Sequence, residues 1–408
     1  MAKLRLAAPR PARTGLLPFV DAVVARERPA EPLLCLRPAT ITAAARRFAD
    51  GFPGDVLYAV KCNPEPRVLR AVWAGGVRHF DCASLPEIAL VRRVLPGEVT
   101  GAQVHFMHPV KARHAIHATF TEHAVTDFAF DSADELEKIL QETVPVGLVG
   151  APPTLGLFVR LAVAQGGAYD LSGKFGVSPG EAGELLRAAR PHAARLGIAF
   201  HVGSQCLDPG AYTHALALAA EAVAGSGVAV DIVDVGGGFP VSYPDTVPPP
   251  LDDYLAAIGS AAAAHFGDAV RLWAEPGRAL VAGGGSVVVQ VELRRGDALY
   301  INDGVYGSLS DAGRPGFRFP ARRIPVDGAA EDVLAPLREY TLFGPTCDSA
   351  DQMRGPFLLP ADIDEGDWIE LGQLGAYGAC LRTRFNGFDS ALTVEVADPP
   401  MLATPGYD

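Results

Sequence analysis

The sequence predicts an α/β protein, a (β/α)₈ TIM barrel followed by a C-terminal β domain. Eight short apolar runs alternate with helix-like stretches between residues 55 and 275, a pattern typical of a parallel sheet with crossover helices. After Glu275 helical spacing gives way to β-like runs separated by turn residues, as expected for a separate domain. The 408 residues can hold a barrel of about 250 residues and a second domain. An open doubly wound sheet is the alternative that the same alternation allows.

The predicted barrel strands are DVLYAVK from Asp55, RHFD from Arg78, QVHFMH from Gln103, DFAFD from Asp127, LGLFVRLA from Leu155, IAFHVGS from Ile198, VDIVDVGGG from Val230 and RLWAEPGR from Arg271. Two of the stretches between them have clear helical spacing, 132–142 and 179–197. In the first, Ser132 and Glu135 have the spacing of a capping box.

Five later runs predict the strands of the β domain: 285–296, 298–303, 338–344, 367–372 and 391–396. The segment 310–332 is rich in Gly, Pro and Arg, and we expect a long loop there. The domain boundaries expected from these patterns are 1–32 for an N-terminal segment that packs on the β domain, 33–278 for the barrel and 279–408 for the β domain.

Composition excludes several classes of protein. Hydrophobic residues make up 49% and charged residues 20%, which excludes a disordered chain. A net charge of −12 argues against a nucleic-acid-binding surface. The six cysteines form no C-x-x-C pair, as is usual in a reducing compartment. Neither a signal peptide nor a run of 18 apolar residues is present, so we expect a cytoplasmic protein with no membrane partner.

The predicted barrel strands end in residues suited to chemistry. These are Lys61, Asp81, His108, Asp131, Arg160, His201, the glycines 236–238 and Glu275. The carboxyl ends of barrel strands form one mouth, where the active sites of barrel enzymes lie. A single charged strand end can simply mark the start of solvent, but seven ionisable ends and a triple glycine that converge on one mouth predict a catalytic site.

The residue types suggest specific roles. Lys61 could pair with a carboxylate or carry a Schiff base, since a desolvated amine is a nucleophile. Glycines 236–238 could turn backbone N–H groups toward an anion, or form a plain tight turn. EPGR at 275–278 could be a local surface pair, or could hold a pyridine nitrogen through Glu275 and an anion through Arg278. Cys347 follows a β-like run and could be reactive or simply buried.

Two H-x-x-H pairs, at 105–108 and 114–117, raise the question of a metal site. Metal binding needs three or four convergent ligands, and no carboxylate pattern accompanies either pair. We therefore predict that there is no metal.

A lysine able to form a Schiff base, an anion cradle, a carboxylate for a pyridine nitrogen and a histidine able to stack together indicate pyridoxal 5'-phosphate (PLP) chemistry. The sequence also resembles the fold-type III PLP-dependent decarboxylases, the ornithine, diaminopimelate and arginine decarboxylase group, and most of all the ornithine decarboxylases. The strings that carry the resemblance are YAVKCNPEP, FDCAS, KFG, HVGSQC, GGGFP, EPGR, NDGVYGS, GPTCDSAD, GAYG and FNGF, in that order from about residue 33 to 398.

The resemblance implies an alanine racemase-like architecture, in which the barrel binds PLP, and a role for each matching residue. Lys61 would carry the cofactor, Glu275 would face the pyridine nitrogen and His201 would stack on the ring. Cys347 would return a proton to Cα after CO₂ leaves. The other cofactor-binding positions would be Asp81, Arg160, Ser204, Gly237, Gly238, Pro276, Gly277, Arg278 and Tyr377.

The resemblance further implies a homodimer in which Cys347 and Asp348 reach the partner's active site. The substrate would contact Asp348, Asp311, Arg314, Tyr306 and Phe385. The expected reaction is the decarboxylation of ornithine to putrescine, a step of polyamine biosynthesis.

One position departs from the family pattern. Where ornithine decarboxylases have an acidic residue that contacts the distal amine, this sequence has Arg314 or Pro315. An arginine there would repel a distal ammonium and attract a carboxylate. Lysine, diaminopimelate or an amino acid with an acidic or modified tail therefore stay open as substrates. A non-catalytic decarboxylase-like regulator, an alanine racemase and a PLP-free aldolase are the remaining alternatives.

Overall fold

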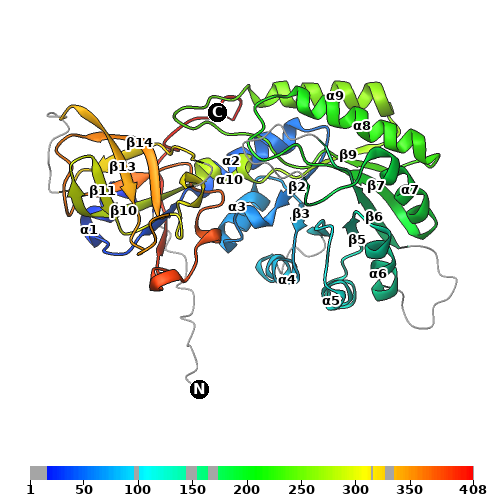
Figure 1. Ribbon diagram of the computed structural model, residues 1–408, viewed down its shortest axis with the longest axis horizontal. Coiled ribbons are helices and arrows are strands. Elements are labelled where there is room, and N and C mark those ends of the chain that lie inside the picture. Colours follow the sequence, from blue (N-terminus) through cyan, green and yellow to red (C-terminus); the bar gives the residue numbers. More distant parts are fainter. Residues whose placement is uncertain are drawn as a thin grey trace, which may run out of the picture.

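The structure is a computed structural model and describes residues 16–95, 101–143, 154–163, 173–313, 316–326 and 335–407. It consists of a barrel and a β-sheet domain side by side (Figure 1). Eight parallel strands close the barrel in sequence order, which confirms the predicted barrel and excludes the open sheet; the sixth of these strands begins at Ala193, five residues before the run predicted from Ile198. The barrel strands are β2 (Gly54–Ala59), β3 (His79–Cys82), β4 (Gln103–Phe106), β5 (Asp127–Phe130), β6 (Leu155–Arg160), β7 (Ala193–Ala199), β8 (Ile232–Asp234) and β9 (Arg271–Ala274).

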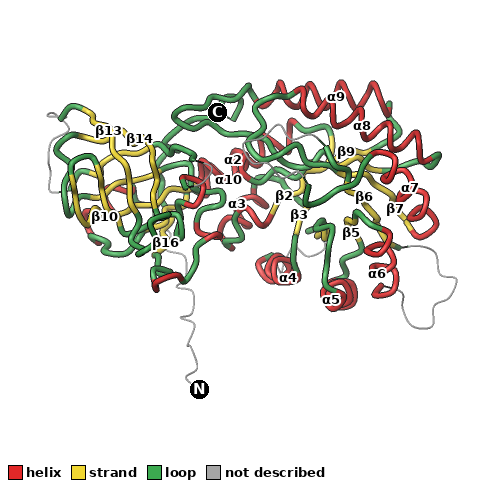
Figure 2. Tube along the Cα trace, in the orientation of Figure 1, coloured by secondary structure: helices red, strands yellow, loops and turns green. Residues whose placement is uncertain are grey.

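Helices cover the outside of the barrel (Figure 2). They are α2 (Pro38–Gly51), α3 (Pro66–Ala74), α4 (Leu85–Val94), α5 (Arg113–His123), α6 (Ala133–Thr143), α7 (Pro179–Ala189), α8 (Gly210–Ser226) and α9 (Leu251–Phe266). The short α10 (Arg278–Val281) follows the last barrel strand. Among the described residues, none of these helices has the length and apolar character needed to cross a membrane.

The two helices predicted in detail had different outcomes. Ser132 caps α6, since its hydroxyl accepts a hydrogen bond from the Glu135 N–H at 3.2 Å. The helix predicted over 179–197 is too long, because α7 ends at Ala189 and β7 begins at Ala193. Pro191 lies in the 3₁₀ turn between them, and a proline cannot donate the backbone bond that a continuing helix requires.

The interior of the barrel is packed with side chains. Phe158 and Trp273 stack there with ring centroids 4.8 Å apart, in a buried cluster that also contains Leu57, Met107 and Ile232. A filled barrel leaves room for a ligand only at its mouths. A ligand site is therefore expected at the carboxyl ends of the strands.

The second domain is an eight-stranded sheet. Its strands are β1 (Leu33–Leu36), β10 (Gly285–Arg295), β11 (Ala298–Ile301), β12 (Ala321–Ile324), β13 (Leu337–Phe343), β14 (Gln352–Pro360), β15 (Trp368–Leu371) and β16 (Leu392–Glu395). Residues 33–36, which we expected to open the barrel domain, pair instead with β10 and β16.

Three strands of the sheet, β1, β12 and β14, were not predicted. The segment expected to be a long loop contains β12, which pairs with β15. β14 was overlooked because its run includes Gly355 and Pro356, and a proline inside a run argues against a strand.

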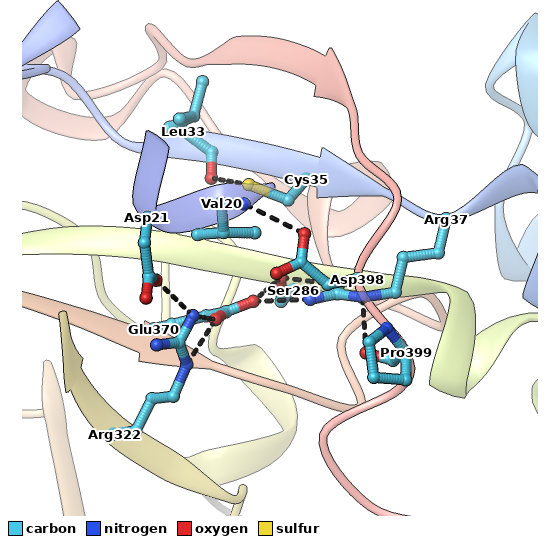
Figure 3. A network of polar contacts seen from close by, with 10 residues as sticks. All are labelled: Val20, Asp21, Leu33, Cys35, Arg37, Ser286, Arg322, Glu370, Asp398 and Pro399. Atoms are coloured by element: carbon cyan, nitrogen blue, oxygen red, sulfur yellow. Dashed lines mark hydrogen bonds and ion pairs between the residues drawn. The ribbon is translucent and has the colours of Figure 1, made fainter. Parts of the chain in front are cut away.

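The described part of the N-terminal segment packs against the sheet domain. Val20 and Val24 on α1 (Val20–Glu27) lie in one buried cluster with Val288 and Trp368. A buried polar network lies beside this cluster (Figure 3). Its polar contacts tie the start of the chain, the sheet and the C-terminal segment together.

Glu370 is at the centre of that network. One of its oxygens accepts hydrogen bonds from Arg37 and Ser286, both at 2.6 Å. The other accepts from Arg322 at 2.8 Å, and Arg322 also pairs with Asp21. Burial disfavours the charged carboxylate, but the two arginines and the Ser286 hydroxyl outweigh it, so the pKa of Glu370 is lowered. Loss of one partner from such a buried network is strongly destabilising, because it leaves an uncompensated buried charge.

Candidate active site

A cavity of about 440 Å³ lies at the carboxyl ends of the barrel strands. It brings together seven residues predicted for the site: Lys61, Asp81, Arg160, His201, Ser204, Glu275 and Tyr377. Tyr377 comes from the segment after β15, and its N–H binds the Cys62 carbonyl at 3.0 Å. The site is thus formed where the barrel meets the β domain.

Lys61 lies in a 3₁₀ turn directly after β2. Its ammonium is 3.2 Å from a carboxylate oxygen of Asp81, which lies one residue before the end of β3 at Cys82 and is only 3% exposed. The negative charge of Asp81 is the largest influence on Lys61 and raises its pKa above the ordinary value, against the opposing effect of burial. Of the two alternatives that the sequence left open for Lys61, the structure shows the pairing with a carboxylate, and that carboxylate outweighs the effect of desolvation.

Glu275 follows β9 and is buried. Its Oε1 atom has no hydrogen-bond partner among the described residues. Burial, followed by the nearby carboxyl groups of Asp234 and Asp81, raises its pKa well above the ordinary value. An acidic group of this kind takes up a cationic N–H donor readily, because the donor's charge offsets the cost of burial.

His201 follows β7 and is neutral. Its Nδ1 accepts a hydrogen bond from the Gly203 N–H at 2.9 Å, so the proton of the neutral ring is on Nε2. Burial and the positive charges of Arg160 and Lys61 lower the pKa of His201 well below its usual value. A neutral ring at the cavity wall is suited to flat contact with another aromatic ring.

The glycines after β8 form a small cradle beside the cavity. It is lined by Ser204, Gly237, Gly238, Arg278 and Tyr377, together with Lys61 and His201. A Cβ at 237 would lie 2.6 Å from the Glu275 carbonyl oxygen, and one at 238 would lie 2.4 Å from the Gly203 carbonyl oxygen. Gly238 also has φ +105°, which other residues rarely adopt. These positions therefore require glycine, with backbone open to the cradle.

Arg278 is fixed at the edge of this cradle. It donates to the Tyr243 hydroxyl at 2.7 Å and to Asp311 at 2.9 Å, and its guanidinium lies 5.0 Å from the Tyr377 ring centre. Its Nε is buried without a hydrogen-bond partner among the described residues. The arginine is held in place and keeps one donor for a further acceptor.

The residues present fit PLP. The unpaired Glu275 carboxyl oxygen suits the pyridine nitrogen. The glycine cradle, Ser204 and the unpaired Nε of Arg278 suit a phosphate. Gly277 lines the same cradle, and the carbonyl of Pro276 accepts a hydrogen bond from the Ala59 N–H at 3.2 Å. Lys61 lines both the cradle and the larger cavity, where an amine could reach an aldehyde.

The predicted substrate residues lie apart from this cavity. Cys347 is exposed, and its N–H donates to Asn386 at 3.0 Å. Asp348 accepts a hydrogen bond from the Tyr306 hydroxyl, and the ring of Tyr306 lies 5.0 Å from that of Phe385. The Ala350 N–H and this hydroxyl lower the pKa of Asp348. They form a second group on the β domain, and none of them lines the cavity of its own chain.

Asp311 and Arg314 complete the predicted set. Asp311 is buried and bound to Arg278, so its carboxylate supports the arginine. Arg314 lies outside the described residues.

Sequence reasoning assigned no role to three residues that lie at the site. Lys174, from the KFG string, and His108, from a strand end, both line the cavity. Asp234 ends β8 and influences Glu275. Only its place two residues before the glycines could have singled out Asp234. Among the described residues, no group of three or more His, Cys, Asp or Glu side chains is arranged to hold a metal ion.

Comparison with known proteins agrees with this geometry. Residues 38–282 match the family described as pyridoxal-dependent decarboxylase, pyridoxal binding domain. The chain is 33% identical to the lysine/ornithine decarboxylase of Selenomonas ruminantium, with 85% of each chain covered. It is 30% identical to antizyme inhibitor 2 of Xenopus laevis, over 85% of this chain and 76% of that protein. The solved lysine/ornithine decarboxylase of Vibrio vulnificus, complexed with putrescine, has a TM-score of 0.77 and 30% identity, covering 92% of this chain and 97% of that one.

The family match spans more than half of the 408 residues, and the relatives span both domains. The barrel with its separate sheet is the fold of these solved structures. The chain belongs to the fold-type III PLP-dependent decarboxylases and is similar to the ornithine and lysine decarboxylases among them.

Proposed function

We propose that this protein decarboxylates a basic L-amino acid, with ornithine as the preferred substrate and putrescine as the product. The observation that carries the proposal is the anionic Asp348 beside the exposed Cys347. A carboxylate with a lowered pKa is a suitable partner for a distal ammonium. The other predicted acid, Asp311, is committed to Arg278.

Each cavity residue then has a defined task. Lys61 holds the cofactor, with Asp81 orienting its amine. Glu275 accepts the N–H of the pyridine ring, and Arg278 with the glycine cradle holds the phosphate. When bound, PLP accepts the electron pair released as the bond from Cα to the carboxylate breaks. His201 keeps one face of the ring covered and dry, where electrostatic contacts are strongest.

Cys347 and Asp348 act across a dimer interface in this proposal, because they do not line the cavity of their own chain. Cys347 donates a proton to Cα after CO₂ leaves, and Asp348 binds the far end of the substrate. The surface around them supports an interface. Leu381, Phe385 and Phe388 are each more than 40% exposed there, and Asn386 between the phenylalanines binds the Cys347 backbone.

A non-catalytic role like that of an antizyme inhibitor is the alternative, because one relative has that name. Two features favour catalysis. Lys61 is ion-paired with Asp81, and Glu275 has an unpaired buried oxygen. A regulator has no need to retain either. Purified protein with a visible absorbance band from bound PLP would support catalysis, and loss of that band in Lys61→Ala would place the cofactor.

The direct test is CO₂ release from ornithine, lysine, arginine, diaminopimelate and glutamate derivatives. We expect release from ornithine, then lysine, and a raised KM for ornithine in Asp348→Asn. The matched variant is Arg314→Asp, which puts an acidic residue at the position where this sequence differs from the ornithine decarboxylases. A tenfold or larger gain in kcat/KM for ornithine in Arg314→Asp, from a nearly inactive wild type, would show that ornithine is not the natural substrate.

A further inference from the structure

Asn63 joins the turn that carries Lys61 to the segment that carries Tyr377. It directly follows the 3₁₀ turn Val60–Cys62 at the end of β2. Its side-chain N–H donates to the Gly375 carbonyl at 2.8 Å, across 312 positions of the sequence. The turn belongs to the barrel, and the other segment follows β15 of the sheet domain. One amide side chain therefore links the two domains beside the cavity.

The orientation of the Asn63 amide is fixed by its partners. Its Oδ1 accepts a hydrogen bond from the Glu65 N–H at 3.1 Å, so the amide nitrogen faces the Gly375 carbonyl. The backbone carbonyl of Asn63 accepts from the Tyr58 hydroxyl at 2.9 Å, and Tyr58 is completely buried in β2. The barrel therefore holds both the backbone and the side chain of Asn63, and the amide N–H is directed at the segment from the sheet domain.

The backbone of Tyr377 needs this support because it is strained. Its φ is +53°, in the left-handed region, and such a conformation of a bulky residue persists only where the surrounding structure imposes it. The Tyr377 N–H donates to the Cys62 carbonyl at 3.0 Å. The Gly375 N–H donates to the Ala282 carbonyl at the same distance. Together with the bond from Asn63, these contacts fix the chain from Gly375 to Tyr377.

We propose that Asn63 is a positioning residue that sets the backbone of Tyr377, and with it the tyrosine ring, relative to Lys61. Lys61 and Tyr377 both line the glycine cradle, although they come from different domains. Asn63 itself lines neither the cavity nor the cradle, so it acts through these two residues. The role rests on the proposed function, which assigns the cradle to the cofactor phosphate.

Two substitutions separate the bond to Gly375 from the local bond to Glu65. Asn63→Ser keeps an acceptor for the Glu65 N–H, adds no charge and lacks the amide N–H that reaches Gly375. Asn63→Ala removes both bonds. Titration of the cofactor-free variants with PLP, followed by visible absorbance, should give about 10- to 100-fold weaker binding than wild type for both, as is typical when a residue that orients a ligand-holding group is lost. Wild-type PLP affinity in Asn63→Ser would overturn the proposal.

The matched control is Asn302→Ser. Asn302 makes the same two kinds of bond within the sheet domain and its N-terminal segment: its side-chain N–H donates to the Ala30 carbonyl at 2.8 Å, and its Oδ1 accepts from the Gln290 N–H at 3.0 Å. None of these three residues lines the cavity. The substitution should lower stability and leave PLP affinity unchanged. If Asn302→Ser weakens PLP binding as much as Asn63→Ser does, the effect is one of general stability and the proposal fails.

Amide hydrogen exchange of the cofactor-free protein provides a readout that needs neither PLP nor turnover. The Tyr377 amide should be protected in wild type, because it is bonded to the Cys62 carbonyl, and should lose most of that protection in Asn63→Ser but not in Asn302→Ser. Equal protection of this amide in wild type and Asn63→Ser would overturn the proposal. Weaker PLP binding in Asn63→Ser, together with a wild type that binds PLP but releases no CO₂ from any amino acid, would contradict the proposed function alone.

Discussion

Replacing Asp81 with asparagine should make Lys61 a faster nucleophile. Asp81 is the largest reason that the pKa of Lys61 is raised, and its oxygen is 3.2 Å from the ammonium. Asparagine keeps the size and a hydrogen-bond acceptor but removes the charge. The pKa of Lys61 should therefore fall, and a larger fraction of the lysine should be the neutral amine that attacks aldehydes.

The size of this effect follows from the exposure of the pair. Hydrogen bonds to charged groups contribute about 1.5–3 kcal/mol. Since 45% of the Lys61 side chain is open to the cavity, solvent screens the pair and the lower value of about 1.5 kcal/mol applies. One pKa unit corresponds to about 1.4 kcal/mol. The neutral fraction of Lys61 should rise roughly tenfold at any pH below its pKa.

The assay is the rate at which cofactor-free protein takes up PLP, followed by visible absorbance at several pH values. Asp81→Asn should be about tenfold faster than wild type at each pH below the pKa of Lys61. Asp131→Asn is the control, because Asp131 directly follows a barrel strand but accepts from the Gly176 N–H at 3.0 Å. Equal uptake rates for Asp81→Asn and wild type would refute the assignment of Asp81 as the group that holds Lys61 charged.

Three further predictions concern the cofactor, the interface and stability. Glu275→Gln should raise the activation free energy of decarboxylation by about 3 kcal/mol, which slows the reaction roughly a hundredfold, and it should reduce PLP occupancy less. An unchanged rate with PLP bound would remove Glu275 from the mechanism. Mixing Lys61→Ala with Cys347→Ala should restore activity, and no restoration after confirmed subunit exchange would argue for sites within one chain. Glu370→Ala should cost about 3–5 kcal/mol in urea unfolding, because buried Arg37 loses its carboxylate. The pKa of Glu370 is lowered in the folded protein, so this contribution should be complete above about pH 4.3 and lost as the pH falls further; a difference that does not shrink in acid would contradict the account.

Residues at strand ends were predictable from the sequence because the barrel imposes its own order. Once eight alternating units are recognised, the carboxyl ends of the strands must converge, and Lys61, Asp81, His201 and Glu275 come together in one cavity. The need for glycine at 237 and 238 has the same origin, since a strand end packs closely against its neighbours there.

Contacts between distant segments could not be predicted in this way. Nothing in the sequence links Arg278 to Asp311, 33 residues later, and the carboxylate was therefore expected to serve the substrate. Asp234 was overlooked because its link to another strand runs through the Gly236 backbone, whose N–H donates to Asp234 and whose carbonyl accepts from the Glu275 N–H. In the sheet domain β1 pairs with β10, and the paired residues are about 250 positions apart in the sequence. The pattern of residues within one strand does not show which distant strand it pairs with.

The most direct test of the account is the identity of the lysine that carries the cofactor. The chain has only five lysines: Lys3, Lys61, Lys111, Lys138 and Lys174. Borohydride reduction of the PLP-loaded protein, followed by peptide mass spectrometry, should place the phosphopyridoxyl group on Lys61. A label on Lys174, which lines the same cavity, or labelling of none of the five, would contradict it.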